Sequence, residues 1–207
     1  MLPPSVITSG LNVPPGALTA SKPPSSASGI TDAPVLSGKA RQADEVPISG
    51  RVALVLGAGG VARAIAHALH REGAMITISN RTYDRAQALA NEIGCRAVEW
   101  DARHGVLCDM VINATSVGMH PNVDESPLHP SFLKPGLLVF ETVYTPEQTL
   151  LVKEARERNC HIITGVEMFI RQAALQFEHF TGRPAPVDLF RQVIRRALSP
   201  VALRDEE

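Results

Sequence analysis

The sequence predicts an α/β protein with a doubly wound parallel sheet, and three observations support this fold class. From residue 51 onward, short apolar segments alternate with longer amphipathic ones, as strands and helices do in βαβ units. The short segments are continuously apolar, which is typical of strands covered on both faces of a parallel sheet. A glycine-rich turn at residues 57–62 joins the first such segment to the first amphipathic one.

The elements follow one another from residue 51. The first strand is expected at residues 51–56, and the helix after it, about 61–72, carries its apolar residues along one stripe. Gly73 ends that helix, the second strand follows at 74–79, and the second helix covers about 83–93. Further strands are expected at 96–99, 109–113, 137–140 and 161–164, and further helices at 146–158, 166–180 and 187–198. This order implies parallel pairing with right-handed crossovers.

The composition changes sharply at about residue 50. Residues 1–50 contain 8 of the 16 prolines, 8 serines, 5 glycines and no aromatic residue. Such a segment has too little apolar area to offset the entropy of ordering it, so we expect a disordered leader over residues 1–50. The remaining chain is predicted to form one domain over residues 51–198, followed by a charged tail at 199–207.

Charge and hydropathy exclude several classes of partner. Lys and Arg total 20 against 21 Asp and Glu, so no net cationic field attracts nucleic acid or an anionic membrane. No apolar run is long enough to span a bilayer, and the N-terminus lacks the basic and apolar regions of a secretory signal. The three cysteines have no metal-ligand spacing and cannot all pair, so we expect no metal site and a cytoplasmic location.

The glycine-rich turn has the pattern G-x-G-x-x-A. Gly57 permits a tight turn, Gly59 lets the backbone approach a pyrophosphate, and the small Ala62 lets the helix pack close to the strand. The amides of the first helical turn then face the phosphates. A plain glycine-rich turn between a strand and a helix is the alternative. The surrounding strand, helix and second strand favour a dinucleotide site.

The end of the second strand selects the cofactor. Enzymes specific for NAD usually place an acidic residue there, which accepts a hydrogen bond from the ribose 2′-hydroxyl. This sequence has no acid at the strand tip: Asn80 and Thr82 offer neutral hydrogen bonds, and Arg81 and Arg85 can bind a 2′-phosphate. We therefore predict NADP. The alternatives are a helix cap at Thr82 with solvated arginines, or an ion pair between Arg81 and Asp84.

Five segments together resemble the shikimate dehydrogenase family. They are residues 57–60 (GAGG), 80–82 (NRT), 112–119 (INATSVGM), 143–146 (VYTP) and 165–173 (GVEMFIRQA). They occur in the order and near the spacing of that family. The resemblance covers residues 51–198 and implies the family's Rossmann-like NADP-binding domain.

The resemblance implies a role for each matching position. The pyrophosphate would lie against Gly57, Ala58, Gly59, Gly60 and Val61, and the 2′-phosphate against Asn80, Arg81, Thr82 and Arg85. The nicotinamide ribose would lie near Asn113, Ala114, Thr115 and Ser116, and the nicotinamide end near Thr142 and Gly165. Tyr144 and Gln172 would reach the substrate, shikimate or 3-dehydroshikimate.

Some of these placements also have support from the residues alone. The segment 113–116 follows a buried strand, where open α/β sheets bind ligands, although a polar loop with a capping Asn113 is the alternative. Tyr144 lies in a turn just after a strand, from which its phenol can project into a cleft. On the helix that carries Gln172, we expect the stripe of Met168, Phe169 and Leu175 to belong to the core.

We predict no catalytic residue in this chain. The resemblance implies a reversible reduction of 3-dehydroshikimate by NADPH, in the pathway to chorismate and the aromatic amino acids, with a Lys–Asp pair in a preceding substrate-binding domain. None of the four lysines stands in the matching motif, and Asp32 is not followed by the expected apolar helix. Glu141 stands where the family commonly has Asp. The chain is therefore interpreted as a fragment, or as one part of a fusion, of an NADP-dependent oxidoreductase.

The sequence is also compatible with two other interpretations. The chain could be a non-catalytic NADP-binding module that senses or regulates through a partner. It could also belong to an enzyme that acts on quinate as well as shikimate.

Overall fold

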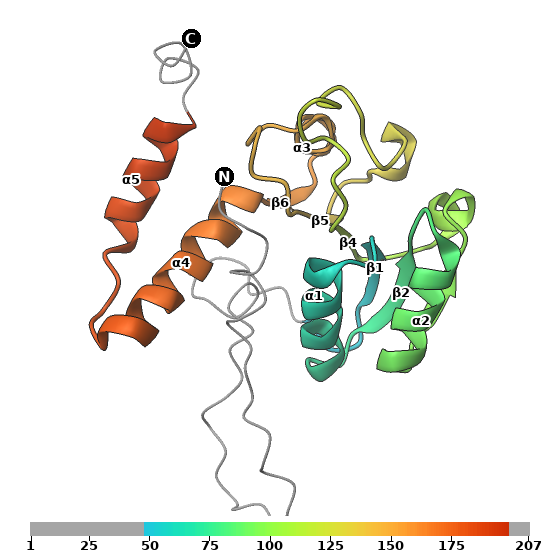
Figure 1. Cartoon of the computed structure of the whole chain (residues 1–207). Helices are drawn as coiled ribbons and strands as arrows, with labels where there is room; N and C mark the ends of the chain where they lie inside the picture. The colour runs from blue at the N-terminus through green and yellow to red at the C-terminus, as the bar shows by residue number, and fades with distance from the viewer. Residues whose placement is uncertain (1–47, 199–207) are drawn as a thin grey trace, which may run out of the picture. The chain divides into compact units, whose positions relative to one another are not determined.

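Six parallel strands form one sheet in the order β3-β2-β1-β4-β5-β6 (Figure 1). This computed structural model describes residues 48–198, so most of the predicted leader and the whole predicted tail lie outside the described residues. The strands are β1 (Val52–Leu56), β2 (Met75–Ser79), β3 (Arg96–Val98), β4 (Met110–Asn113), β5 (Leu138–Glu141) and β6 (His161–Ile163). The predicted doubly wound parallel sheet is confirmed.

Among residues 48–198, five α-helices and two short 3₁₀ helices connect and follow the strands. The α-helices are α1 (Gly60–Arg71), α2 (Tyr83–Ile93), α3 (Leu150–Glu157), α4 (Gly165–Thr181) and α5 (Val187–Ala197), and the 3₁₀ helices are η3 (Asp101–Gly105) and η4 (Pro130–Phe132). Within residues 48–198, no helix combines the length and the apolar character needed to cross a membrane.

The strand order reverses between β1 and β4. From β1 the chain first builds the sheet outward through β2 and β3, then returns and adds β4, β5 and β6 on the other side of β1. The ends of β1 and β4 lie level, because Leu56 pairs with Asn113 in the register of the two strands. In open α/β sheets, ligands bind outside the carboxyl ends of the strands at such a reversal.

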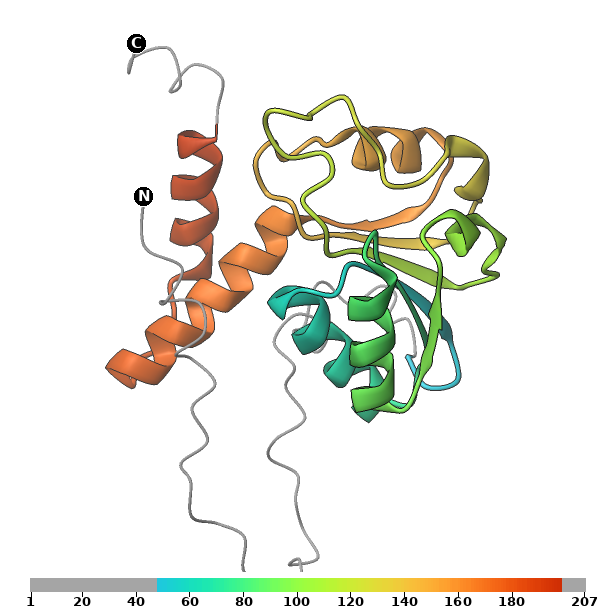
Figure 2. The same cartoon turned by 45° about the vertical axis from the view of Figure 1, so that its right-hand side comes forward.

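Each face of the sheet carries its own apolar cluster. Along β1, Ala53 and Val55 belong to the cluster with α1 and α2, whereas Leu54 and Leu56 belong to the cluster with α3 and η4. Figure 2 shows α1 and α2 on one side of the sheet and α3 on the other. This double covering explains why the strands are continuously apolar in the sequence.

Helix α3 begins later than predicted. Its predicted start is residue 146, but the helix begins at Leu150. Thr149 is the N-cap, and its hydroxyl accepts a hydrogen bond from the backbone N–H of Val152 at 3.2 Å. This cap fixes the start of the helix and leaves residues 146–149 in the loop.

Helices α4 and α5 run antiparallel (Figure 1). Glu167 near the start of α4 pairs with Arg191 of α5 at 3.1 Å, and the ring of Phe177, farther along α4, contacts the ring of Phe190. None of the residues of α5 is buried.

The expected core stripe on α4 is wrong for Phe169 and Leu175, which are 42% and 38% exposed. The reason is that α4 extends past the sheet, and only its start packs on the sheet's core.

Candidate dinucleotide site

The turn after β1 can be formed only by glycine at its first position. Gly57 has a φ of +111°, and a Cβ there would lie 2.5 Å from the carbonyl oxygen of Ala114. The N–H of Gly57 donates a hydrogen bond to the carbonyl of Ser79 at 2.8 Å. The turn is therefore held between the ends of β2 and β4, where only a residue without a side chain fits.

The start of α1 is open toward solvent. Gly59 is the N-cap and offers no side-chain partner, and the first turn contains no acidic residue. A Cβ on Gly59 or Gly60 would meet no atom within 4 Å, so the protein's own packing does not require glycine at either position. The fully buried Ala62 brings the helix close to the sheet. Free amides at a helix start, with no Cβ above them, suit a pyrophosphate.

Two cationic side chains follow β2, Arg81 in the loop and Arg85 in the first turn of α2. Arg81 and Arg85 are exposed, and neither forms an ion pair within residues 48–198. The proposed pairing of Arg81 with Asp84 is absent there, and Asp84 lies in the first turn of α2. Thr82 is the N-cap residue of α2, but its hydroxyl makes no capping hydrogen bond to the backbone N–H groups at the start of that helix.

The end of β4 is ordered by the side chain of Asn113, which is fully buried. Its Oδ1 accepts hydrogen bonds from the N–H and the hydroxyl of Thr115, at 3.2 and 2.7 Å, and its Nδ2 donates to the carbonyl of Val117 at 3.2 Å. The polar atoms of Asn113 are thus used within the protein, while Ala114, Thr115 and Ser116 are partly or fully exposed. Asn113 therefore shapes this loop, and the next three residues present its surface.

The end of β5 holds a fully buried acid, Glu141. Its oxygens accept hydrogen bonds from Asn113 Nδ2, from the N–H of Val143 at 2.9 Å and from the hydroxyl of Thr149 at 3.0 Å. Burial raises the pKa of the Glu141 carboxyl above its usual range, and these hydrogen bonds act in the opposite direction. Next to it, Thr142 donates from its hydroxyl to the carbonyl of Asn113 at 2.8 Å.

The loop after β5 meets the start of α4 closely. A Cβ on Gly165 would lie 2.3 Å from the carbonyl oxygen of Val143, so this contact needs glycine. Beyond it, the ring of Tyr144 lies 5.3 Å from the ring of Phe169, centroid to centroid. Tyr144 is 47% exposed, and Gln172 is exposed one turn after Phe169 on α4. Tyr144, Phe169 and Gln172 therefore form one polar and aromatic surface.

Sequence reasoning missed two parts of this region. Phe169 was assigned to the core because its spacing fits an apolar stripe, and that spacing does not reveal where the supporting sheet ends. The link between Glu141 and Thr149 was missed because it joins a strand end to a helix cap that was placed wrongly. The capping pattern of Thr149 ahead of an apolar helix was the available signal.

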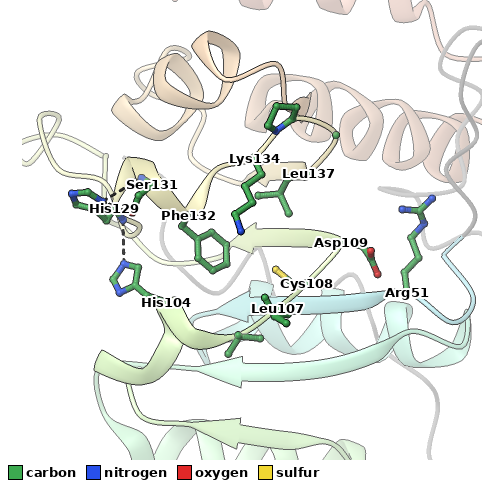
Figure 3. Close-up of a pocket in the computed structure, with 13 residues that line it drawn as sticks. Arg51, His104, Leu107, Cys108, Asp109, His129, Ser131, Phe132, Lys134 and Leu137 are labelled. Carbon is green, nitrogen blue, oxygen red and sulfur yellow. Dashed lines mark hydrogen bonds between the residues drawn. The ribbon is translucent and has the colours of Figure 1, made fainter.

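A separate cavity of about 400 Å³ lies at the amino ends of the strands (Figure 3). Arg51, Asp109 and Leu137, which line it, immediately precede β1, β4 and β5. Burial, with a smaller effect of Asp109, raises the pKa of the Cys108 thiol to about 12, so this thiol stays protonated. Among residues 48–198, no group of three His, Cys, Asp or Glu side chains could hold a metal ion.

Two family models that describe the same family match separate parts of this chain. The family model for "Shikimate / quinate 5-dehydrogenase" matches residues 39–126, and the model for "Shikimate 5'-dehydrogenase C-terminal domain" matches residues 165–195. A bifunctional 3-dehydroquinate dehydratase/shikimate dehydrogenase of Arabidopsis thaliana is 43% identical over 153 residues, which cover 72% of this chain and 25% of that protein.

Two further relatives agree. A shikimate dehydrogenase (NADP(+)) of Shouchella clausii is 39% identical over 157 residues, 73% of this chain and 57% of that enzyme. The solved shikimate 5-dehydrogenase of Thermus thermophilus, in complex with NADP(H) and shikimate, superposes with a TM-score of 0.66 and 37% identity over 73% of this chain and 57% of that one. The chain thus spans little more than half the length of these single-function relatives. The sheet order, the glycine-rich turn and these matches show that the chain belongs to the shikimate dehydrogenase family.

Proposed function

We propose that this chain binds NADP and is the cofactor-binding part of an enzyme that interconverts 3-dehydroshikimate and shikimate. The main support is the pair Arg81 and Arg85, which stand exposed in the loop after β2 and in the first turn of α2. A 2′-phosphate carries about two negative charges, and two guanidinium groups can bind it by charge-assisted hydrogen bonds. A ribose 2′-hydroxyl offers them no such partner.

The extended cofactor would lie across the reversal between β1 and β4. The pyrophosphate would contact the amides from Gly57 to Val61, and the adenosine end would lie beside Asn80, Arg81, Thr82 and Arg85. The nicotinamide end would lie over β4 and β5, beside Ala114, Thr115, Ser116, Thr142 and Gly165. Bound NADPH supplies a hydride for a substrate carbonyl, and the chain's own residues bind the cofactor and orient it.

Tyr144 and Gln172 are proposed to contact the substrate. The Tyr144 hydroxyl has no hydrogen-bond partner among residues 48–198, and the ring rests on Phe169, which limits where the hydroxyl can point. Gln172 offers an amide on the same side of α4. Both groups suit the hydroxyls and the carboxylate of a shikimate-like molecule. The matching family description includes quinate, so quinate is a second candidate substrate.

We propose that a substrate-binding domain, not described by this structure, completes the active site with an acid–base pair. Relatives nearly twice as long as the matched region support this idea. So does the surface of α4 and α5, which exposes the apolar side chains of Phe169, Leu175, Phe180, Leu189 and Val193. An apolar surface of this kind is typical of a contact with another domain.

The free cysteines Cys95, Cys108 and Cys160 support a cytoplasmic location.

A binding experiment tests the cofactor assignment. The chain is titrated with NADPH and with NADH, and the titrations are repeated with Arg81→Ala. We expect wild type to prefer NADPH, and the substitution to weaken NADPH by about tenfold or more while NADH changes little. Equal losses for both cofactors would contradict the 2′-phosphate assignment.

An activity measurement separates the enzyme from a sensor. The chain is mixed with shikimate and NADP⁺, and the absorbance of reduced nicotinamide is followed, first alone and then with a substrate-binding domain of a relative. Turnover that requires the added domain supports the proposal. Tight NADPH binding without turnover under either condition would favour a sensing or regulatory module.

A further inference from the structure

The carboxylate of Glu141 joins three segments that are far apart in the sequence. Its Oε1 accepts hydrogen bonds from Asn113 Nδ2 at 3.0 Å and from the N–H of Val143 at 2.9 Å. Its Oε2 accepts from Asn113 Nδ2 at 3.1 Å and from the Thr149 hydroxyl at 3.0 Å. The side chain is fully buried, so water does not compete for these bonds. The ends of β4 and β5 and the start of α3 are therefore tied to one group.

Glu141 also determines how the Asn113 amide is oriented. An ionised carboxylate offers only acceptors, so the Asn113 NH₂ group must face it, and Oδ1 must face the other way. Oδ1 then accepts from both the N–H and the hydroxyl of Thr115. The Thr115 hydroxyl in turn accepts from the N–H of Val117 at 3.1 Å. The carboxylate and the Val117 carbonyl both accept from Asn113 Nδ2, so the conformation of residues 114–117 depends on the carboxylate through Asn113.

The same network supports two close backbone contacts. Ala114 follows Asn113, and its carbonyl faces Gly57 in the dinucleotide turn; Val143 donates to Glu141, and its carbonyl faces Gly165 at the start of α4. A shift of either carbonyl would change the space on the β4 and β5 side of the site. In a doubly wound sheet each half binds one mononucleotide, so this side receives the nicotinamide half.

We propose that Glu141 is a positioning residue for the nicotinamide half of the bound cofactor. It acts through Asn113 and Val143, because it is buried beneath the site and cannot touch the cofactor itself. The adenosine half lies over β2, away from the network, and does not depend on it. This inference rests on the proposed function, since it requires that the chain binds NADP.

The test compares two ligands that share the adenosine half. NADPH has both halves, whereas 2′,5′-ADP has the adenosine and its 2′-phosphate but no nicotinamide. In Glu141→Gln, an amide NH₂ replaces one acceptor oxygen and faces the donor Asn113 Nδ2 in either orientation, together with the N–H of Val143 or the hydroxyl of Thr149. We expect the dissociation constant for NADPH to rise about tenfold and that for 2′,5′-ADP to stay unchanged. Glu157→Gln, at an exposed position on α3, is the matched control and leaves both constants unchanged.

Each other outcome contradicts the inference in its own way. Equal weakening of the two ligands would show a general structural role, and no weakening would show that the network does not affect the site. If wild type binds neither ligand, the proposed function fails and this inference fails with it. Should Glu141→Gln not fold, Thr149→Val removes one hydrogen bond to the carboxylate, and the same selective but smaller loss is expected.

Discussion

Gly57 lies against Ala114 so closely that a Cβ on Gly57 would stand 2.5 Å from the Ala114 carbonyl oxygen. Gly57 also has a φ of +111°, which L-residues with a side chain rarely adopt. We therefore predict that Gly57→Ala lowers the free energy of unfolding by about 1–3 kcal/mol, as measured by urea denaturation. The same variant should weaken NADPH binding, because the turn can relieve the clash only by moving.

Gly59→Ala separates stability from binding in the same turn. A Cβ on Gly59 meets no protein atom within 4 Å, and Gly59 has a φ of −86°. We expect its unfolding free energy to stay within about 0.5 kcal/mol of wild type, while NADPH binding weakens because the Cβ occupies the approach of the pyrophosphate. Normal NADPH affinity in this variant would contradict the placement of the pyrophosphate.

Thr149 makes a capping hydrogen bond that Thr82 does not. Thr149→Val should lower the free energy of unfolding by about 1–2 kcal/mol, because the buried hydroxyl both caps α3 at Val152 and donates to Glu141. Thr82→Val is the matched control at the N-cap of α2, where the hydroxyl makes no capping bond, and it should change stability little. Chemical denaturation of the two variants side by side gives the comparison. Equal losses of unfolding free energy in the two variants would show that the Thr149 hydroxyl contributes no more than an N-cap hydroxyl that makes no capping bond.

The sequence was sufficient for those parts of the fold that depend on local patterns. The strands β1 and β4 are continuously apolar because helices cover both faces, and the turn at Gly57 requires glycine for reasons of backbone geometry. Both signals lie within a few residues. The start of α3 was placed wrongly because Pro146 and Thr149 are both acceptable near a helix start, and only the bond to Val152 decides between them.

The candidate site was predictable only in part, because its supports are not local. Asn113 and Glu141 are 28 residues apart, and neither position indicates from its neighbours that the two side chains meet in the core. The exposure of Phe169 depends on where the sheet ends relative to α4, which periodicity along one helix does not specify. Sequence patterns therefore predicted candidate residues at the carboxyl ends of the strands and missed the buried network of Asn113, Glu141 and Thr149 beneath them.

His104 gives a prediction about pH. Its Nε2 accepts a hydrogen bond from the N–H of His129 at 3.1 Å, which requires a neutral ring. Desolvation, with smaller effects of Arg103 and His129, lowers the pKa of His104 below its ordinary value. As the pH falls through the ordinary histidine range, the unfolded chain therefore takes up this proton first, and stability is lost.

The measurement compares wild type with His104→Gln, whose amide oxygen can accept the same bond without titrating. Between about pH 7.5 and pH 5, wild type should lose more unfolding free energy than His104→Gln does. His70→Gln, at an exposed position on α1, controls for removing a histidine and should follow wild type. Parallel pH profiles for wild type and His104→Gln would show that His104 does not contribute.

Tyr144 is the substrate-side residue whose hydroxyl can be removed with the least structural effect. The hydroxyl has no partner among residues 48–198, and the stacking on Phe169 is retained by Tyr144→Phe, so the stability and the NADPH affinity should not change. If the phenol binds shikimate, the dissociation constant for shikimate in the presence of NADP⁺ should rise about five- to tenfold. An NMR titration, which detects weak binding, measures this constant. Tyr83→Phe, which removes a hydroxyl bonded to Gln87 on α2, is the matched control and should leave it unchanged. Unchanged shikimate binding in Tyr144→Phe would place the substrate elsewhere on the surface formed by Tyr144, Phe169 and Gln172.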